Sequence, residues 1–276
     1  RANAELASKN AIIERQKLIV EERNKEVMDS ITYARRIQDA ILPPIRLIEA
    51  SLPECFVLYK PKDIVAGDFY WLENQEEMSL FAAADCTGHG VPGAMVSVVC
   101  NNALNRSVRE FGLTVPGEIL DKTRELVIQQ FEKSDEEVKD GMDVALCSLK
   151  KDADKSILCY AGANNALWII RNGAEEIEEY KANKQPIGKV DDPQPFVTHT
   201  VNLNPGDCFY IFSDGYVDQF GGEKGKKFKA KPFKQLLMSI QEGPMEGQHS
   251  VIDEAFEAWR GDLEQVDDVC VIGVRV

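Results

Sequence analysis

The stretch Asp85-Cys86-Thr87-Gly88-His89-Gly90-Val91-Pro92-Gly93 is the most informative part of the chain. The apolar run 81–84 leads into Asp85, which predicts a buried strand that ends at an acidic residue. Three glycines and a proline in so short a span are costly in chain entropy, so a plain turn does not account for them. The stretch therefore predicts a strand, a tight glycine-rich turn and then a helix over Pro92–Arg109.

Three further motifs place acidic residues beside apolar runs or turn residues. They are Gly67-Asp68-Phe69-Tyr70-Trp71, Ser213-Asp214-Gly215 and Asp267-Asp268. A single Asp beside Gly is more often a turn residue than a ligand, but carboxylates at the ends of several buried strands converge in space. Converging carboxylates repel one another unless a cation lies between them, and a hard divalent cation prefers oxygen ligands. The motifs together predict a carboxylate centre for Mg²⁺ or Mn²⁺, with two metals.

Taken together, these residues resemble the metal-dependent, type 2C-like (PPM) serine/threonine protein phosphatases, specifically their bacterial SpoIIE/RsbU-like branch. The resemblance covers about residues 55–276, and its motifs occur in the family's order at plausible spacing. The segments that carry it are Gly67-Asp68-Phe69-Tyr70, Asp85-Cys86-Thr87-Gly88-His89-Gly90-Val91-Pro92-Gly93-Ala94, Ala161-Gly162-Ala163-Asn164, Gln185-Pro186-Ile187-Gly188, Ser213-Asp214-Gly215-Tyr216-Val217-Asp218 and Asp267-Asp268-Val269-Cys270-Val271.

The resemblance implies a role for each acid. Asp85 would bridge the two divalent cations, and the backbone carbonyl of Cys86 would help to bind one of them. Asp68 would hold the second cation, largely through bound water. Asp214 and Asp267 would complete the shell of the first cation.

Two of the metal-ligand assignments stay open. Asp268 is the immediate neighbour of Asp267, and either residue could be the ligand. Similar enzymes have a weaker third metal, which Asp140 or Asp143 would serve here.

The sequence also departs from the family pattern. Ala163 occupies a position where His is common, and Trp71 stands where an acid is common, but neither change removes a proposed ligand. His89 lies beside Asp85 and is a candidate general acid, yet we favour a role in bracing the glycine-rich turn. No arginine is clearly placed as a phosphate clamp, which leaves Lys60 and Lys62 as substitutes, although an exposed lysine more often serves solubility.

The expected chemistry also follows from the residues. Phosphate monoesters are among the slowest bonds to hydrolyse, with enzymatic accelerations of up to about 10²¹-fold. Two cations about 4 Å apart can activate a water and neutralise the phosphoryl oxygens, so that no protein nucleophile is required. The sequence agrees, because it contains no Gly-x-Ser-x-Gly elbow and no Gly-x-x-x-x-Gly-Lys-Ser/Thr phosphate loop.

Composition limits which classes of fold, partner and compartment suit the chain. With 276 residues and 44% hydrophobic content the chain can bury one large core. A net charge of −14 argues against nucleic-acid binding. No apolar run is long enough to span a membrane, and no signal peptide is visible, so we expect this segment to make no membrane contact. Seven cysteines without a metal-type pairing predict buried thiols in a reducing cytoplasm.

Residues 1–42 have a different sequence pattern from residues 43–276, which are the predicted phosphatase domain. Apolar or small residues recur every seven positions in this segment, and Pro43-Pro44 would stop the helix. The heptad d positions are Leu6, Ile13, Val20, Val27, Ala34 and Ile41, and the a positions are Asn10, Lys17, Asn24, Ile31 and Gln38. This pattern predicts a long helix with a weak, parallel, dimeric coiled-coil seam. A solvated helix packed on the catalytic domain is an equally good interpretation.

The rest of the chain alternates between short apolar runs and amphipathic segments. We expect an α+β fold, and the resemblance implies two central antiparallel sheets flanked by helices, an α-β-β-α sandwich. The predicted strands are 68–72, 79–85, 144–149, 156–160, 166–170, 196–203, 208–213 and 269–276, and the predicted helices are 92–109, 118–133 and a late one around 254–259. The lysine-rich segment 221–231 is expected to be a solvated loop, with a mobile flap that meets an acidic or phosphorylated partner as the alternative.

These features favour a metal-dependent phosphatase acting on phosphoserine or phosphothreonine of a partner protein. By family analogy it would be the output module of a bacterial signalling protein, cytoplasmic and part of a longer, possibly membrane-tethered chain with an upstream sensor module. Its substrate would be a phosphorylated anti-sigma-factor antagonist. A catalytically silent dimeric scaffold and a small-molecule phosphatase are the alternatives.

Overall fold

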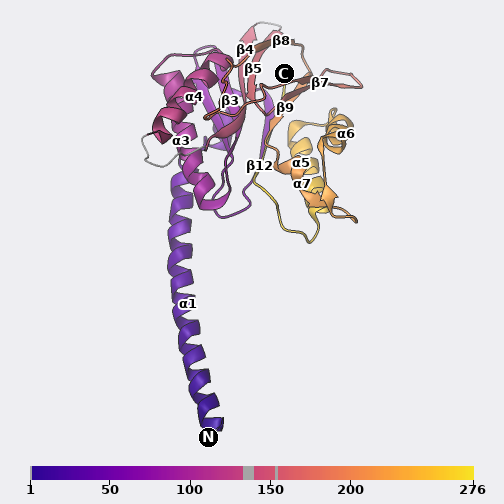
Figure 1. Ribbon diagram of the computed structural model, residues 1–276. Coiled ribbons are helices and arrows are strands. Elements are labelled where there is room, and N and C mark those ends of the chain that lie inside the picture. The colour runs from indigo at the N-terminus through magenta and orange to yellow at the C-terminus, as the bar shows by residue number, and fades with distance from the viewer. Residues whose placement is uncertain (1, 133–139, 153–154) are drawn as a thin grey trace.

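The chain folds into four layers, with two β-sheets in the middle and helices on both outer faces (Figure 1). The computed structural model describes residues 2–132, 140–152 and 155–276. The α+β prediction, with two antiparallel sheets flanked by helices and a long N-terminal helix, is confirmed. All of the strand pairings within the two large sheets are antiparallel.

Each large sheet contains five strands. One has the order β1-β12-β9-β6-β7, with β1 (Glu54–Lys60), β12 (Val269–Arg275), β9 (Cys208–Phe212), β6 (Leu167–Ile170) and β7 (Ile177–Tyr180). The other has the order β2-β3-β4-β5-β8, with β2 (Phe69–Gln75), β3 (Met78–Cys86), β4 (Met142–Asp152), β5 (Lys155–Ala163) and β8 (His199–Leu203). A short hairpin pairs β10 (Phe220–Gly221) with β11 (Lys226–Lys227).

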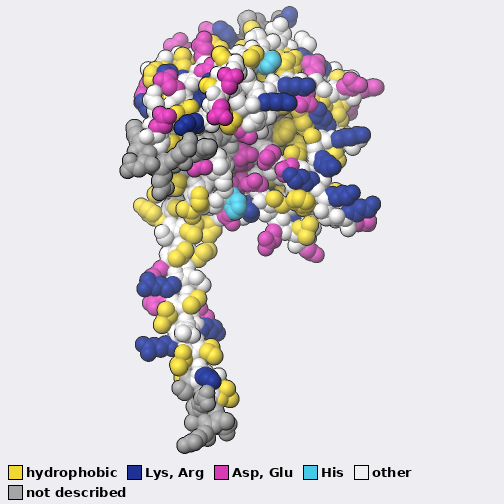
Figure 2. Space-filling view, viewed as in Figure 1, with side chains coloured by type: hydrophobic (Ala, Val, Ile, Leu, Met, Phe, Trp, Pro, Cys, Tyr) yellow, Lys and Arg dark blue, Asp and Glu magenta, His cyan; other side chains and the backbone are white. Residues whose placement is uncertain are grey.

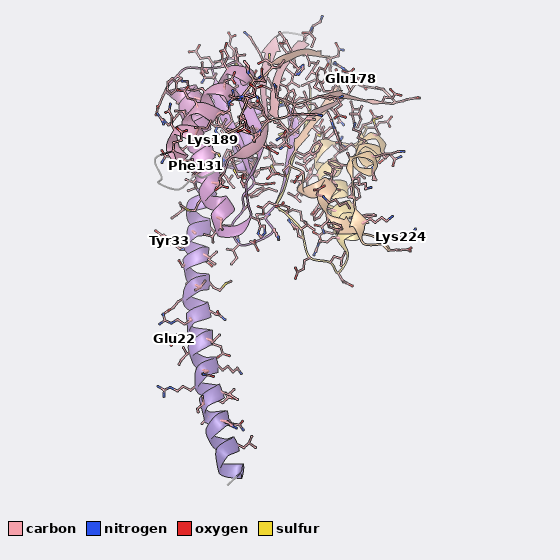
Figure 3. All side chains as sticks on the ribbon, viewed as in Figure 1. Glu22, Tyr33, Phe131, Glu178, Lys189 and Lys224 are labelled. Carbon is pink, nitrogen blue, oxygen red and sulfur yellow. The ribbon has the colours of Figure 1, made fainter. Side chains whose placement is uncertain are left out.

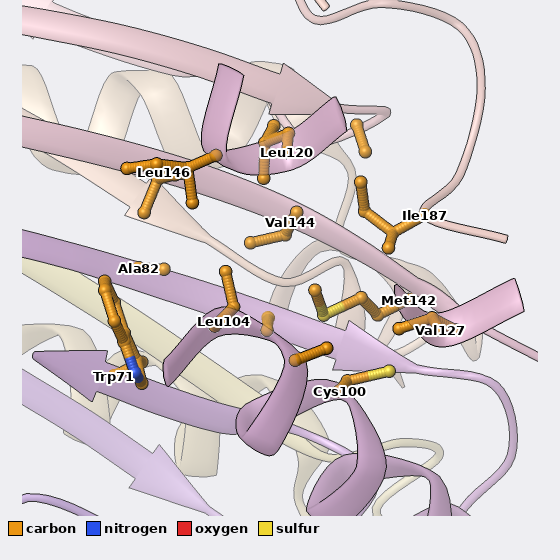
Figure 4. Packing of buried hydrophobic residues seen from close by; sticks show 14 of the residues in the cluster. Trp71, Ala82, Cys100, Leu104, Leu120, Val127, Met142, Val144, Leu146 and Ile187 are labelled. Carbon is orange, nitrogen blue, oxygen red and sulfur yellow. The ribbon is translucent and has the colours of Figure 1, made fainter. Parts of the chain in front are cut away.

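Three apolar clusters hold the layers together. The inner cluster lies between the two sheets and includes Phe81 and Phe209, whose rings stack at a centroid distance of 6.0 Å. A second cluster joins the sheet β2-β3-β4-β5-β8 to α3 (Gly90–Arg109) and α4 (Pro116–Phe131). Figure 4 shows Leu104 and Leu120 among the members of this cluster. A third joins the other sheet to α5 (Gly215–Asp218), α6 (Ala230–Ile240) and α7 (Met245–Arg260). Because both faces of each sheet are covered, the middle parts of its central strands are mostly apolar.

The predicted elements are found within a few residues of their expected bounds. The hairpin of 68–72 with 79–85 is β2 and β3, and the helix over 92–109 is α3. The helix predicted over 118–133 begins two residues earlier, with Pro116 in its first turn, where proline's missing N–H is not needed. Sequence patterns did not indicate β1, β7, α6 or the short helix α2 (Ile45–Ser51).

The N-terminal helix α1 (Ala2–Asp39) projects away from the sandwich, and only its C-terminal end reaches the domain, beside α3 (Figure 1). Four of its predicted d residues, Leu6, Ile13, Val20 and Val27, expose 55–59% of their surface. Packing of the whole helix on its own domain, the second interpretation above, is therefore wrong. The assignment of Gln38 to a coiled-coil a position is also wrong, because this side chain is buried against the domain.

None of the described helices combines the length and apolar character needed to cross a bilayer. All seven cysteines are free thiols, and five of them are buried.

Candidate metal centre

The strands that carry the predicted acids end near one another in the middle of the fold. β3 contains Asp85 at its end, Asp214 follows β9, and Asp267 precedes β12. β9 and β12 are hydrogen-bonded neighbours, and β3 packs against both across the inner core. The two-sheet architecture therefore brings together three carboxylates that are far apart in the sequence.

These carboxylates surround a cavity of ≈ 270 Å³. One part of its wall is the end of β3 with the glycine-rich turn that follows. The start of β4 and the segment before Gly188 form further parts. Asp214 and Asp267, next to strands of the other sheet, complete it. The lining residues are Asp85, Cys86, Thr87, Gly88, His89, Gly141, Met142, Asp143, Pro186, Gly188, Asp214 and Asp267. Figure 2 shows acidic side chains gathered near the centre of this face of the molecule.

Burial and mutual repulsion raise the pKa values of the acids around the cavity. Burial, followed by the charges of Asp214 and Asp267, raises the pKa of Asp85 to about 8. Burial is also the largest cause that raises the pKa of Asp214 and of Asp143. A cluster of carboxylates with such raised pKa values stores unfavourable electrostatic energy that a bound cation would relieve.

Asp68 immediately precedes β2, does not line the cavity, and is 2% exposed. Ser213 donates a hydrogen bond to its carboxylate, whereas the buried Oδ2 atom has no hydrogen-bond partner. Burial and then the charge of Asp85 raise the pKa of Asp68 well above its usual range. A buried carboxylate oxygen without a hydrogen-bond partner is uncommon, and such an oxygen is suited to be a cation ligand.

The geometry separates Asp267 from Asp268. Asp267 lines the cavity. Asp268 is 1% exposed, and its carboxylate accepts hydrogen bonds from the backbone N–H groups of Lys62 and Gly67, both at 2.7 Å. The Asp268 carboxylate is therefore used to hold the loop before Asp68, and Asp267 is the member of the pair that faces the other acids.

Glycines allow the loops around the site to approach one another. A Cβ atom on Gly67 or on Gly93 would collide with the backbone carbonyl of Gly88. Gly88 itself has a φ of 83°, in the left-handed region that favours glycine. The three glycines thus allow the Asp68 loop, the turn after Asp85 and the first turn of α3 to pack backbone against backbone.

Asp143 lies directly opposite Asp85, as its register partner on β4. Asn164 donates a hydrogen bond of 2.8 Å to the Asp143 carboxylate, and its own backbone has a φ of 58°. Asp140, the other residue considered for a third metal, does not line the cavity. Sequence reasoning gave no function to Asn164 or Ser213, although both stand in motifs that it singled out.

The basic residues near the site have other partners or positions. Lys60 forms ion pairs with Asp253 and Glu257 of α7 at 2.5 and 2.6 Å and does not line the cavity. The Nζ atom of Lys62 lies 3.2 Å from Nε2 of His89, whose Nδ1 atom is 2.9 Å from the carboxylate of Asp63. These contacts agree with the expectation that His89 braces the turn.

The lysine-rich segment 221–231 forms the β10–β11 hairpin and the start of α6. Lys227 pairs with Asp218 at 2.6 Å, and Asp218 is the charge that most raises the pKa of Asp214. Lys224 lies at the outer edge of the domain (Figure 3). The hairpin is therefore linked electrostatically to the acidic cavity, while its tip stays exposed.

The donor set fits an oxygen-ligated divalent cation. Among residues 2–132, 140–152 and 155–276, no three acidic, histidine or cysteine side chains meet closely enough to hold one ion by themselves. The acids surround the cavity instead of meeting at a point, so an ion there would take further ligands from water and backbone carbonyls. Mg²⁺ ordinarily binds in this way, with one or two carboxylates and several waters.

Comparison with known proteins identifies the family and the fold of the chain. The sequence profile of Stage II sporulation protein E (SpoIIE) matches residues 75–276, a range that contains Asp85, Asp214 and Asp267. The chain is similar to the SiaA-PP2C domain of Pseudomonas aeruginosa, with 31% identity and a TM-score of 0.82 over 92% of this chain and 98% of that one. No curated protein matches the chain in sequence.

Two more distant structures have the same fold. The RsbU and RsbW domains of Rv1364c from Mycobacterium tuberculosis match with 20% identity and a TM-score of 0.63, over 82% of this chain and 60% of that one. The PP2C phosphatase domain and a regulatory-domain fragment of SpoIIE from Bacillus subtilis match with 17% identity and a TM-score of 0.62, over 80% of this chain and 63% of that one.

Proposed function

The chain belongs to the SpoIIE family, whose PP2C-type domains are serine/threonine phosphatases, and from this premise we propose that it hydrolyses phosphoserine or phosphothreonine on a partner protein with the help of divalent cations. The observation that carries the proposal is the ring of Asp85, Asp143, Asp214 and Asp267 around one cavity. The raised pKa of Asp85, about 8, supports a site that collects cations.

Each acid has a proposed place around two Mn²⁺ or Mg²⁺ ions. Asp85 would contribute to both ions, Asp214 and Asp267 to the first, and Asp68 with the backbone carbonyl of Cys86 to the second. The unpaired Oδ2 atom of Asp68 supports the last assignment. Bound cations of this kind lower the pKa of a water ligand and neutralise charge on the phosphoryl oxygens. Asp143, oriented by Asn164, would add a weaker third position.

The chain's own residues shape the remainder of the site. The turn braced by His89 and Asp63 forms one side of the cavity, and the segment at Pro186 and Gly188 forms another. The cavity volume of ≈ 270 Å³ is large enough for a phosphoryl group. The finer assignment of the substrate, a phosphorylated anti-sigma-factor antagonist, rests on family membership and on the pairing of RsbU and RsbW domains in one of the similar structures.

We also propose that α1 forms a parallel homodimer and links the phosphatase to an upstream sensor module. The stripe of Leu6, Ile13, Val20 and Val27 is more than half exposed in the single chain, and such heptad spacing favours pairing with a second helix. The seam would end before Gln38, which is buried against its own domain.

The test measures hydrolysis of a phosphorylated peptide and of a simple phosphate ester in Mn²⁺, in Mg²⁺ and in chelator. Asp85→Asn and Asp214→Asn should each lower metal-dependent turnover by roughly 10²–10³-fold, because charge stabilisation at the reacting group is lost. Asp192→Asn, at an exposed acid outside the cavity, is the control and should keep full activity.

The rates on the phosphorylated peptide and on the simple ester distinguish the proposed function from its alternatives. A rate on the simple ester that equals or exceeds the rate on the peptide would favour a small-molecule phosphatase. Absence of turnover on both, with Mn²⁺ bound, would favour the catalytically silent scaffold and contradict the proposal.

A further inference from the structure

Six lysines lie between residues 224 and 234, in the β10–β11 hairpin and the start of α6. The segment 224–240 contains no acidic residue, although the chain as a whole has a net charge of −14. A net charge so far from zero already favours solubility, and six lysines reduce it, so solubility does not account for them. We call this set the lysine face, and its members are Lys224, Lys226, Lys227, Lys229, Lys231 and Lys234.

Most of the lysine face has no acidic partner. Lys227 pairs with Asp218, and Lys234 pairs with Glu179, both at 2.6 Å. The other four members are exposed and form no ion pair within residues 2–132, 140–152 and 155–276, namely Lys224, Lys226, Lys229 and Lys231. Their charges are therefore available to a partner of opposite charge.

The lysine face is attached to the element that follows the acid of β9. The backbone N–H of Phe228 donates to the carbonyl of Gln219 at 2.9 Å, and the N–H of Lys229 donates to the carbonyl of Val217 at 2.7 Å. Val217 belongs to α5, which begins directly after Asp214. The segment that carries the lysines is thus held against the same short helix that borders the cavity.

The backbone of Lys229 is strained. Its φ of 73° and ψ of 159° lie in a region that favours glycine, yet the residue is a lysine with an exposed side chain. Strained conformations of this kind cluster at functional positions. The strain therefore supports a use for the Lys229 side chain beyond solvation.

One end of the lysine face lies close to the cavity, and the other lies at the edge of the domain. The charge of Asp218 helps to raise the pKa of Asp214, and the charges of both acids help to raise the pKa of Lys227. Lys224 lies at the outer edge (Figure 3). Along that side, Figure 2 shows Lys and Arg side chains next to the acidic side chains near the centre of the face. The positive charge therefore extends outward from the cavity.

We propose that the lysine face is a docking surface for an acidic segment of the partner protein, adjacent to the phosphorylated residue. This inference rests on the proposed function and names the chemistry of its substrate, a phosphorylated residue flanked by aspartate or glutamate. Attraction between the two surfaces speeds association and lowers KM. Because the lysines do not touch the reacting group, they leave kcat unchanged.

The experiment measures kcat and KM on two phosphoserine peptides in Mn²⁺. One peptide has acidic residues on both sides of the phosphoserine, and the other has glutamine in their place. The test protein carries three substitutions in the lysine face, Lys224→Gln, Lys226→Gln and Lys231→Gln. The control protein loses the same charge outside the lysine face and the cavity, through Lys25→Gln, Lys122→Gln and Lys150→Gln.

The test protein should have at least about tenfold lower kcat/KM on the acidic peptide, through KM, with kcat within about twofold of wild type. Its kcat/KM on the glutamine peptide should change less than about twofold, and the control protein should resemble wild type on both peptides. The preference of the wild type for the acidic peptide should shrink as salt rises to about 0.5 M, because salt screens exposed charges.

Lys229→Gly separates docking from a structural role. Glycine adopts the strained backbone readily, so this variant should unfold at a higher urea concentration than wild type. It should nevertheless have a higher KM on the acidic peptide, because a charge is lost. Fluorescence anisotropy of the unphosphorylated acidic peptide gives a readout that does not depend on activity, and the test protein should bind this peptide more weakly than the control protein does.

Two outcomes would overturn the proposal. One is equal kcat/KM of the test and control proteins on the acidic peptide. The other is unchanged peptide kinetics in the test protein together with lost binding to phosphatidylserine vesicles, which would assign the lysine face to a membrane. If the wild type turns over neither peptide but still binds the unphosphorylated acidic peptide more tightly than the test protein does, the docking surface is supported and the phosphatase activity is not.

Discussion

Asp267 and Asp268 are adjacent in the chain, but their carboxylates have different surroundings. Asp268 accepts hydrogen bonds from two backbone N–H groups at 2.7 Å, whereas Asp267 faces the cavity. Asp268→Ala should lower the free energy of unfolding of the metal-free protein by about 3 kcal/mol, because buried N–H groups lose their acceptor. Urea unfolding in chelator measures the change.

The neighbouring substitution is the matched control. Asp267→Ala should change the same free energy by less than about 1 kcal/mol, since it removes one of several mutually repelling charges. It should instead weaken Mn²⁺ binding. An equal loss of stability in both variants would contradict the distinction between the two residues.

The raised pKa of Asp85 predicts how stability depends on pH. Its folded-state pKa of about 8 lies above the usual value of 3.8, so between these values the folded state holds a proton that the unfolded state has lost. This contribution to stability is fully present below pH 3.8 and is lost as the pH rises through about 8. Metal-free protein should therefore become less stable from pH 5 to pH 8, by up to about 1.4 kcal/mol per pH unit for this one proton.

Urea unfolding in chelator at several pH values tests the sign. Asp85→Asn should flatten the dependence, because its amide does not titrate. Mn²⁺ competes with the same proton, so Mn²⁺ affinity should increase with pH up to about 8. A rise in the stability of the metal-free wild type over this range would contradict the prediction.

At the scale of elements, two physical effects act in opposite directions at the glycine-rich start of α3. Helix propensity alone predicts that Gly93→Ala is stabilising, since alanine is the better helix former. A Cβ atom on Gly93 would collide with the Gly88 carbonyl, however, which is backbone and cannot rotate away. Overpacking should dominate, so we expect Gly93→Ala to lower the free energy of unfolding by about 2 kcal/mol.

Gly247, within α7, is the matched control because a Cβ atom there makes only ordinary contacts, at 3.5 Å or more. Gly247→Ala should raise the free energy of unfolding by about 0.5 kcal/mol. Thermal unfolding compares the two variants. Stabilisation by Gly93→Ala would mean that the turn after Asp85 does not need its close backbone packing.

The elements that the sequence indicated are those with a strong local signal. The apolar runs before Asp85 and Asp214 identified β3 and β9, and periodicity identified α3. β7 (Ile177–Tyr180) contains two glutamates and lies at the sheet edge, where one face is exposed, so its pattern is weak. Short or edge elements depend on a partner strand, which a local pattern does not reveal.

At the scale of the whole molecule, the projecting helix α1 predicts a dimer. The chain carries Val20 and Val27 on its exposed stripe, and a parallel pair would place each beside its symmetry mate. With the half-buried Cys55 and Cys159 replaced by serine, Val20→Cys and Val27→Cys should each form interchain disulfides under mild oxidation. Glu22→Cys, on the opposite face of the seam, should crosslink at least about fivefold less.

The phosphatase rate of the disulfide-locked dimers then tests whether α1 carries a signal to the phosphatase domain. Locking at Val20 or Val27 should change phosphatase turnover or its Mn²⁺ dependence relative to the reduced protein. If neither lock changes either quantity, α1 is a tether and does not carry a signal. Non-reducing gels and a phosphatase assay on the same samples give both results.

The sequence by itself determined the four acidic motifs, their order, the strand-turn-helix around Asp85 and the long N-terminal helix. These features are local, because apolar periodicity, glycine-rich turns and heptad spacing act within a few residues. Family resemblance then supplied the two-sheet architecture.

Tertiary structure alone decided the choices that depend on residues far apart in the chain. The Asp268 carboxylate holds the Lys62 N–H across 206 residues of sequence, which leaves Asp267 to face the cavity. Gln38 fits the heptad pattern of a coiled coil, yet its amide is hydrogen-bonded to the backbone N–H and carbonyl of Ala66 and is buried against the domain. Hydrogen-bond partners of buried groups are set by which segments the fold brings together, and no local pattern contains that information.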